Sequence, residues 1–214
     1  TFGPFPFGDG HTTSKVDEVL GRPLIWVETA HFRIGSSLEE YPLSKAPKDE
    51  KAKLKDELAR LRERLPEVKA KPRELDPWLR VHLFAMRLEE QYADFVERFA
   101  PGVTFPEKGQ RTPMGMGPFL GMPSKYTVLL TQRFDTFGRY TSHFHGAPQR
   151  AAIRHNAYEA GSLFYGLVVD AFEGEYASDT SLHCNVASGV AQNLVNGFRF
   201  YGHDPPLWWG EGIG

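Results

Sequence analysis

The chain has a single cysteine, Cys184, and almost no net charge, since its 25 Lys and Arg nearly balance its 27 Asp and Glu. One cysteine excludes an intrachain disulfide framework and a zinc cluster held by several thiolates. The formal charge of −2 argues against nucleic acid as a partner, because positive charge drives that binding. No apolar run approaches the roughly 18 residues of a transmembrane span, although association with a membrane complex stays open.

Apolar and aromatic residues are plentiful, at 41% and 13% of the chain, which is enough for a sizeable core. Phe2, Phe5 and Phe7 lie among prolines and glycines at the start of the chain, where regular structure is disfavoured. We therefore expect residues 1–22 to form an extended arm that packs at least one of these rings onto another surface. That surface is either the chain's own domain or a partner protein.

Half of the charged residues lie between positions 45 and 98. Leu54, Leu58, Leu61 and Leu65 have the spacing of one helix stripe, which ends before Pro66. A second helix should start at Asp76-Pro77 and continue to about residue 99. The pattern predicts a helical hairpin, which is either a solvated pair or a coiled-coil surface for a partner.

The remaining patterns predict an α+β fold with few strands and long helices. Strands are expected at 24–34, 126–131 and 163–172, helices at 147–160 and 180–195, and an irregular loop at 107–125. We divide the chain into the arm (1–22), a segment with the first strand, the hairpin and the loop (23–125), and a C-terminal portion (126–214).

Two histidines, His143 and His145, flank Phe144. In an extended segment their imidazoles would lie on one side, about 6.5–7 Å apart. They would ligate zinc if a third ligand such as Glu211 converged, and otherwise they are hydrogen-bonded loop histidines.

The last forty residues resemble the gluzincin-type (peptidase MA-like) zinc metallopeptidases. In that family an edge strand binds the substrate backbone, the next helix carries His-Glu-x-x-His, and a Pro-x-Trp-x-x-Glu-Gly pattern supplies the third zinc ligand. The segment 206–212 matches the last pattern and places Glu211 as that ligand. The expected strand at 163–172 corresponds to the edge strand. The resemblance implies a zincin-like fold, with a small mixed sheet, over residues 126–214.

The positions of the His-Glu-x-x-His motif are degenerate, because Ser188, Gly189 and Gln192 stand where the two ligands and the general base should be. Zinc and its activated water need nitrogen or carboxylate ligands and a carboxylate base. We therefore expect neither catalysis nor a cofactor. Ser188 and Gln192 share a helix face, and we expect them to donate hydrogen bonds to Glu211.

Three functions remain open at this stage. The first is a catalytically inactive metallopeptidase-like protein that acts as a binding or structural subunit. The second is an active zinc peptidase or hydrolase using His143, His145 and Glu211. The third is an accessory subunit of a larger assembly, held by the arm and the hairpin. The first and third are compatible, and both imply other protein subunits as partners.

Two further features bear on partners and location. The chain stops where family members continue into further helices, so we expect a partner to cover Trp208 and Trp209. The family is mostly exported in bacteria, and a chain that begins with Thr1 is consistent with a removed signal peptide. We expect a periplasmic or extracellular protein.

Overall fold

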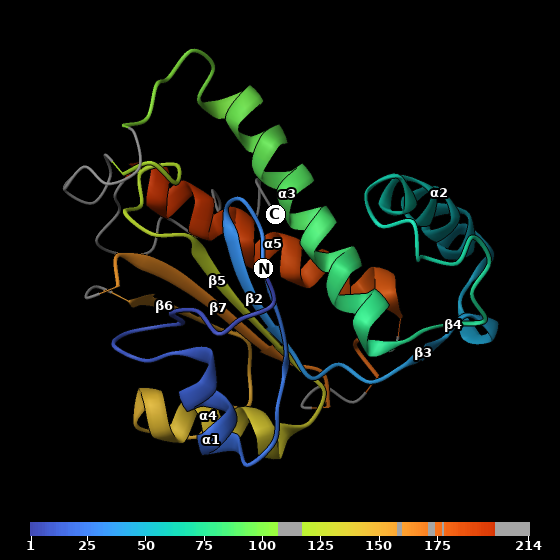
Figure 1. Cartoon of the computed structure of the whole chain (residues 1–214), viewed down its shortest axis with the longest axis horizontal. Coiled ribbons are helices and arrows are strands. Elements are labelled where there is room, and N and C mark those ends of the chain that lie inside the picture. The colour runs from blue at the N-terminus through green and yellow to red at the C-terminus, as the bar shows by residue number, and fades with distance from the viewer. Residues whose placement is uncertain (107–116, 158–159, 171–173, 177, 200–214) are drawn as a thin grey trace.

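A computed structural model describes residues 1–106, 117–157, 160–170, 174–176 and 178–199. This part of the chain has a mixed α+β fold (Figure 1). Its helices are α1 (Thr13–Leu20), α2 (Lys48–Arg64), α3 (Pro77–Phe99), α4 (Phe134–His145) and α5 (Asp179–Arg199), with a 3-10 turn at Leu43–Lys45. Its strands are β1 (Ile25–Glu28), β2 (Phe32–Ser36), β3 (Tyr41–Pro42), β4 (Glu74–Leu75), β5 (Tyr126–Thr131), β6 (Ile153–Ala157) and β7 (Ser162–Val168).

A mixed five-stranded sheet has the order β1-β2-β5-β7-β6. Strands β2, β5 and β7 are parallel, and β1 and β6 run antiparallel at the two edges. The single strand predicted at 24–34 is wrong, because the chain reverses between β1 and β2 and forms a hairpin. The predicted division of the chain between residues 125 and 126 separates strands of one sheet, because β2 before it pairs with β5 after it.

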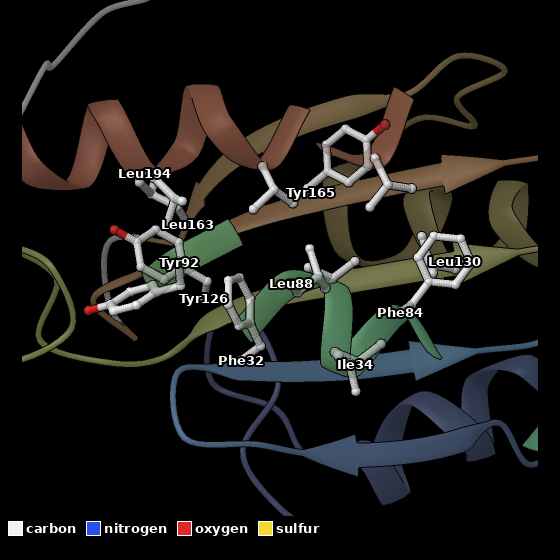
Figure 2. Close-up of a cluster of buried hydrophobic side chains, with 14 of the residues drawn as sticks. Phe32, Ile34, Phe84, Leu88, Tyr92, Tyr126, Leu130, Leu163, Tyr165 and Leu194 are labelled. Atoms are coloured by element: carbon white, nitrogen blue, oxygen red, sulfur yellow. The ribbon is translucent and has the colours of Figure 1, made fainter. Parts of the chain in front are cut away.

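Helices cover both faces of the sheet (Figure 1). On one face, α3 and α5 pack against alternate residues of the strands, including Phe32, Tyr126 and Tyr165 (Figure 2). On the other face, α1 and α4 pack against Leu129 and Phe164. This alternation follows from the two-residue period of a strand, and the buried patterns of β5 and β7 fit a sheet covered on both sides.

The helical hairpin is confirmed as α2 and α3. The side chain of Asp76 accepts a hydrogen bond from the backbone N–H of Leu79 at 2.8 Å and caps α3, with Pro77 at the first turn. The leucine stripe of α2 is buried in a cluster with Leu79 and Leu83 of α3. The hairpin therefore forms its own small core beside the sheet.

The helix predicted at 147–160 is wrong. The helix in this part of the chain is α4, which ends at His145, and residues 153–157 form strand β6. Phe134, Phe137 and Tyr140 have helical spacing and pack α4 onto the sheet. Gly146 then ends α4 in the left-handed region, with φ of 81°. The polar residues of β6 favoured a helix locally, and pairing with β7 overrides that preference.

The remaining predicted elements agree more closely with the structure. Strand β5 and helix α5 are confirmed, with α5 continuing to Arg199. The strand predicted at 163–172 is β7, but it ends at Val168 and residues 169–170 form a turn. Val186 and Leu194 of α5 share its core, as expected. The expected loop at 107–125 lies partly outside the described residues.

The N-terminal arm docks on its own domain. Phe5 and Phe7 are 6% and 0% exposed and pack around Trp26, whereas Phe2 is 62% exposed. Residues 1–5 and 7–11 lie outside helices and strands, as predicted. The expected extended arm over 1–22 is wrong beyond them, because Thr13–Leu20 form helix α1, whose N-cap is Thr12. In this structure Phe5 and Phe7 are therefore packed inside their own domain and are not available for insertion into a partner.

Candidate functional site

Helix α5 carries Ser188, Gly189 and Gln192, the residues that the resemblance aligns with the metallopeptidase motif, and side chains cap its N-terminus. The Ser178 hydroxyl accepts a hydrogen bond from the backbone N–H of Ser181 at 3.0 Å. The Glu50 carboxylate, from α2, accepts one from the backbone N–H of Thr180 at 2.8 Å. An anion at this end also interacts favourably with the helix dipole. Side chains far apart in sequence thus fix the position of α5.

The motif face of α5 looks away from α3. The Gln91 amide donates a hydrogen bond to the backbone oxygen of Ala187 at 2.7 Å, and the ring of His183 lies against Phe84 of α3. Ser188 lies about 100° around the helix from Ala187, and Gln192 is one turn further along. Both are half-buried. Since α3 packs on β1 and β2, this face is turned away from those two strands.

Gly189, the residue that the resemblance aligns with the general base, lies directly against an aromatic ring. Gly189 is buried, and a Cβ atom placed on it would overlap the ring of Tyr165 from β7. Tyr165 is 2% exposed, and its hydroxyl donates a hydrogen bond to Asn185 Oδ1 at 2.5 Å. Burial raises the pKa of Tyr165, so it stays a neutral phenol. A carboxylate at position 189 has no room unless this ring moves.

The edge strand beside α5 is β6 and not the predicted strand at 163–172. Strand β7 is interior, between β5 and β6. In the antiparallel register Arg154 pairs with Tyr165 and Asn156 pairs with Leu163, so both side chains of β6 are on the α5 side of the sheet. Within the described residues, β7 is the one strand that pairs with β6. Sequence reasoning missed Tyr165, Arg154 and Asn156, because the pairing of β6 with β7 has no local signature.

The side chains at the three aligned positions of α5 do not fit zinc. Ser188 offers a hydroxyl, Gln192 a neutral amide and Gly189 no side chain, and the Tyr165 ring occupies the space that a side chain at position 189 would need. Among the described residues, no group of three or more His, Cys, Asp and Glu side chains is arranged to hold a metal ion. Glu211, Trp208 and Trp209 lie outside the described residues, so the expected contact of Glu211 with Ser188 and Gln192 stays a prediction.

His143 and His145 lie on helix α4 and not in an extended segment, so the predicted arrangement on one side is wrong. Residues two apart on a helix point in very different directions. The His145 ring lies 5.5 Å from that of Phe164, on the face of the sheet opposite α5. Its neighbour in β6 is His155, with ring centroids 4.7 Å apart. The two histidines therefore do not join the motif face.

Replacing Gly189 with alanine should lower the free energy of unfolding by about 1–3 kcal/mol, because the methyl group overpacks the contact with Tyr165. Urea unfolding followed by fluorescence measures this. Gly138 of α4 is the matched control, since its Cβ would meet Phe134 at an ordinary 3.4 Å. Gly138→Ala should be neutral or stabilising by up to about 1 kcal/mol. Equal effects of the two substitutions would contradict the close contact of Gly189.

Comparison of the chain with known family models, with curated proteins and with solved structures found no match. Of the helices in the described part of the chain, none is both long enough and apolar enough to span a bilayer. The functional conclusion therefore depends on the site itself and on the resemblance in the sequence.

Proposed function

We propose that the chain is a catalytically inactive, metallopeptidase-like protein with a zincin-like fold, which acts as a binding or structural subunit. The observation that carries this proposal is the contact between Tyr165 and Gly189. An enzyme of this type needs a carboxylate at that position to activate water. Here the space is closed by a buried ring, and the two flanking motif positions hold Ser188 and Gln192.

The scaffold that the resemblance implies is compatible with the described elements. An antiparallel edge strand, β6, lies beside the strand that precedes the motif helix. This supports the zincin-like assignment, although the edge strand is the one before β7. An exported location and membership of a larger assembly belong to the same proposal.

The proposed ligand is an extended polypeptide segment that pairs with the outer edge of β6. The outer N–H and C=O groups of an edge strand bind a peptide as an additional strand, and neighbouring side chains select it. Residues 153–156 of β6 are half-buried or exposed, and Arg154 and Asn156 lie on the side of α5. Retaining this edge without the catalytic groups gives binding without hydrolysis.

The test measures zinc content, hydrolysis and binding on the same purified chain. With denatured, fluorescein-labelled casein peptides as the probe, we expect binding by fluorescence anisotropy and no cleavage, with less than about 0.1 zinc per chain after dialysis against zinc chloride. Stoichiometric zinc together with casein hydrolysis would overturn the proposal in favour of the zinc peptidase using His143, His145 and Glu211.

A pair of proline variants tests the edge. Successive N–H groups of a strand point to opposite edges, so either His155→Pro or Asn156→Pro removes an outer N–H and the other removes a bond to β7. The variant that stays folded, by circular dichroism, should bind casein peptides at least about tenfold more weakly. Unchanged binding by that folded variant would contradict the edge-strand site.

A further inference from the structure

The N-terminal arm meets α4 and β6 at a cluster of histidines that the motif face does not include. His11 of the arm stacks on Phe144 of α4, with centroids 3.9 Å apart and planes at 17°. His145 of α4 meets His155 of β6 edge to face at 4.7 Å. Three sequence-distant elements thus bring their imidazoles to one place.

Asp9 ties the arm to the same elements. Its backbone oxygen accepts a hydrogen bond from His11 Nδ1 at 2.7 Å, which fixes the tautomer of a neutral His11. Its carboxylate accepts a hydrogen bond from the backbone N–H of Ala160 at 3.1 Å and lies 3.7 Å from His155 Nε2. The Gly8 backbone lies directly under the His11 ring, where a Cβ would overlap it. Residues 8–11 are therefore clasped onto α4 and the β6–β7 hairpin.

Two ring nitrogens in this clasp, His11 Nε2 and His145 Nε2, are buried and have no hydrogen-bond partner among the residues that the structure describes. Adding a proton to either nitrogen would bury an unpaired N–H and a positive charge. Burial, the neighbouring His155 and His11 lower the pKa of His145 to about 4, against the weaker opposite effect of Asp9. Burial likewise lowers the pKa of His11, with Asp9 raising it and His143 lowering it further.

We propose that this cluster is a proton-operated clasp, which holds the arm at neutral pH and releases residues 8–12 from α4 and β6 on acidification. The groups that face it in the described structure are Asp9 from the arm, Tyr140 and His143 from α4, and His155 from β6. Tyr140 stays neutral, because burial raises its pKa. Asp9 is the attractive group, and it touches the exposed His155 and not the two buried nitrogens.

The direction and size of the effect follow from linkage. The pKa of His145 is about 4 when the arm is packed and 6.5, the ordinary histidine value, when the arm is released. Its full contribution to the stability of the packed arm is therefore present above pH 6.5 and is lost as the pH falls toward 4. Between pH 7.5 and pH 5.0 such a group favours release by about 30-fold. Since His145 is half-buried, we expect an observed change of about tenfold.

Hydrogen exchange of the intact chain tests the clasp. The Phe7 N–H, which donates to the His11 backbone oxygen at 2.9 Å, and the Thr13 N–H, which donates to that of Phe5 at 3.0 Å, report on the arm. After correction for intrinsic exchange rates, their protection should fall about tenfold from pH 7.5 to pH 5.0. In the His145→Gln variant, and in the double variant that also carries His11→Asn, the pH-dependent change in protection should shrink to less than about threefold.

His183 is the matched control, because burial first, then Arg87 and Lys53, lower its pKa to about 4, and it lies on α5 across the sheet. His183→Gln should keep the full pH response of the arm. Wild-type protection that is equal at both pH values would overturn the clasp, as would an undiminished response in folded His145→Gln. One equivalent of zinc bound at pH 7.5, and lost in His145→Gln, would also overturn it by making the cluster a metal site.

Discussion

Replacing Arg87 with methionine should lower the free energy of unfolding by about 3–5 kcal/mol, because it leaves two buried carboxylates without their counter-ion. The Arg87 guanidinium lies 2.6 Å from both Glu57 of α2 and Asp179 of α5, and all three side chains are at most 5% exposed. Arg87 thereby joins three helices. Urea unfolding at pH 7.5 measures the loss.

Arg60→Met is the control for this pair of helices. Arg60 also bridges α2 and α3, through Glu90 at 3.1 Å, but the two side chains are 49% and 43% exposed. Water screens that pair, so its removal should cost less than about 1 kcal/mol. Comparable losses of stability for Arg87→Met and Arg60→Met would mean that the buried ion pairs of Arg87 do not hold the hairpin to α5.

Replacing Phe7 with alanine should cost about 3–5 kcal/mol, because the ring is fully buried in the layer of α1 and α4. Its centroid lies 4.8 Å from that of Trp26, and it also contacts Tyr140 and Phe164. The cavity left by alanine cannot collapse easily among these large rings. The same unfolding measurement, with Trp26 as a fluorescent neighbour, reports the change.

Phe2→Ala is the control within the arm, since Phe2 is 62% exposed and touches only the ring of His82 at 5.6 Å among the ring contacts of the described residues. It should change the stability by less than about 0.5 kcal/mol. A large effect of Phe2→Ala, or a small one of Phe7→Ala, would contradict an arm that belongs to the chain's own core.

The motif on α5 shows how far residue types alone could define the site. Ser188, Gly189 and Gln192 were assigned to the motif positions by the resemblance, and their residue types offer no good zinc ligand. Nothing in the sequence indicates that Tyr165 fills the space at Gly189. That contact depends on the register of α5 against β7, which is set by the packing of Val186 and Leu194 on the sheet.

The histidines also show that sequence spacing does not predict which side chains meet in the fold. His143 and His145 were prominent because one residue separates them in the sequence, and the extended geometry assumed for them was wrong. The histidines that lie near His145 are His155 of β6 and His11 of the arm. A cluster drawn from three elements has no spacing that a reader of the sequence could recognise.

The sequence by itself determined the elements whose pattern is complete within one segment: the helices of the hairpin, strand β5 and helix α5. The helices repeat apolar residues at the helical period and have a cap or a breaker at an end, and β5 is a short run rich in strand-forming residues, so the local pattern decides their structure. The tertiary structure decided the reversal between β1 and β2, the edge position of β6, the ring over Gly189 and the docking of the arm. In each of these, the stabilising partner is a residue far away in the chain, and the free energy of that contact exceeds the small local preference of the segment.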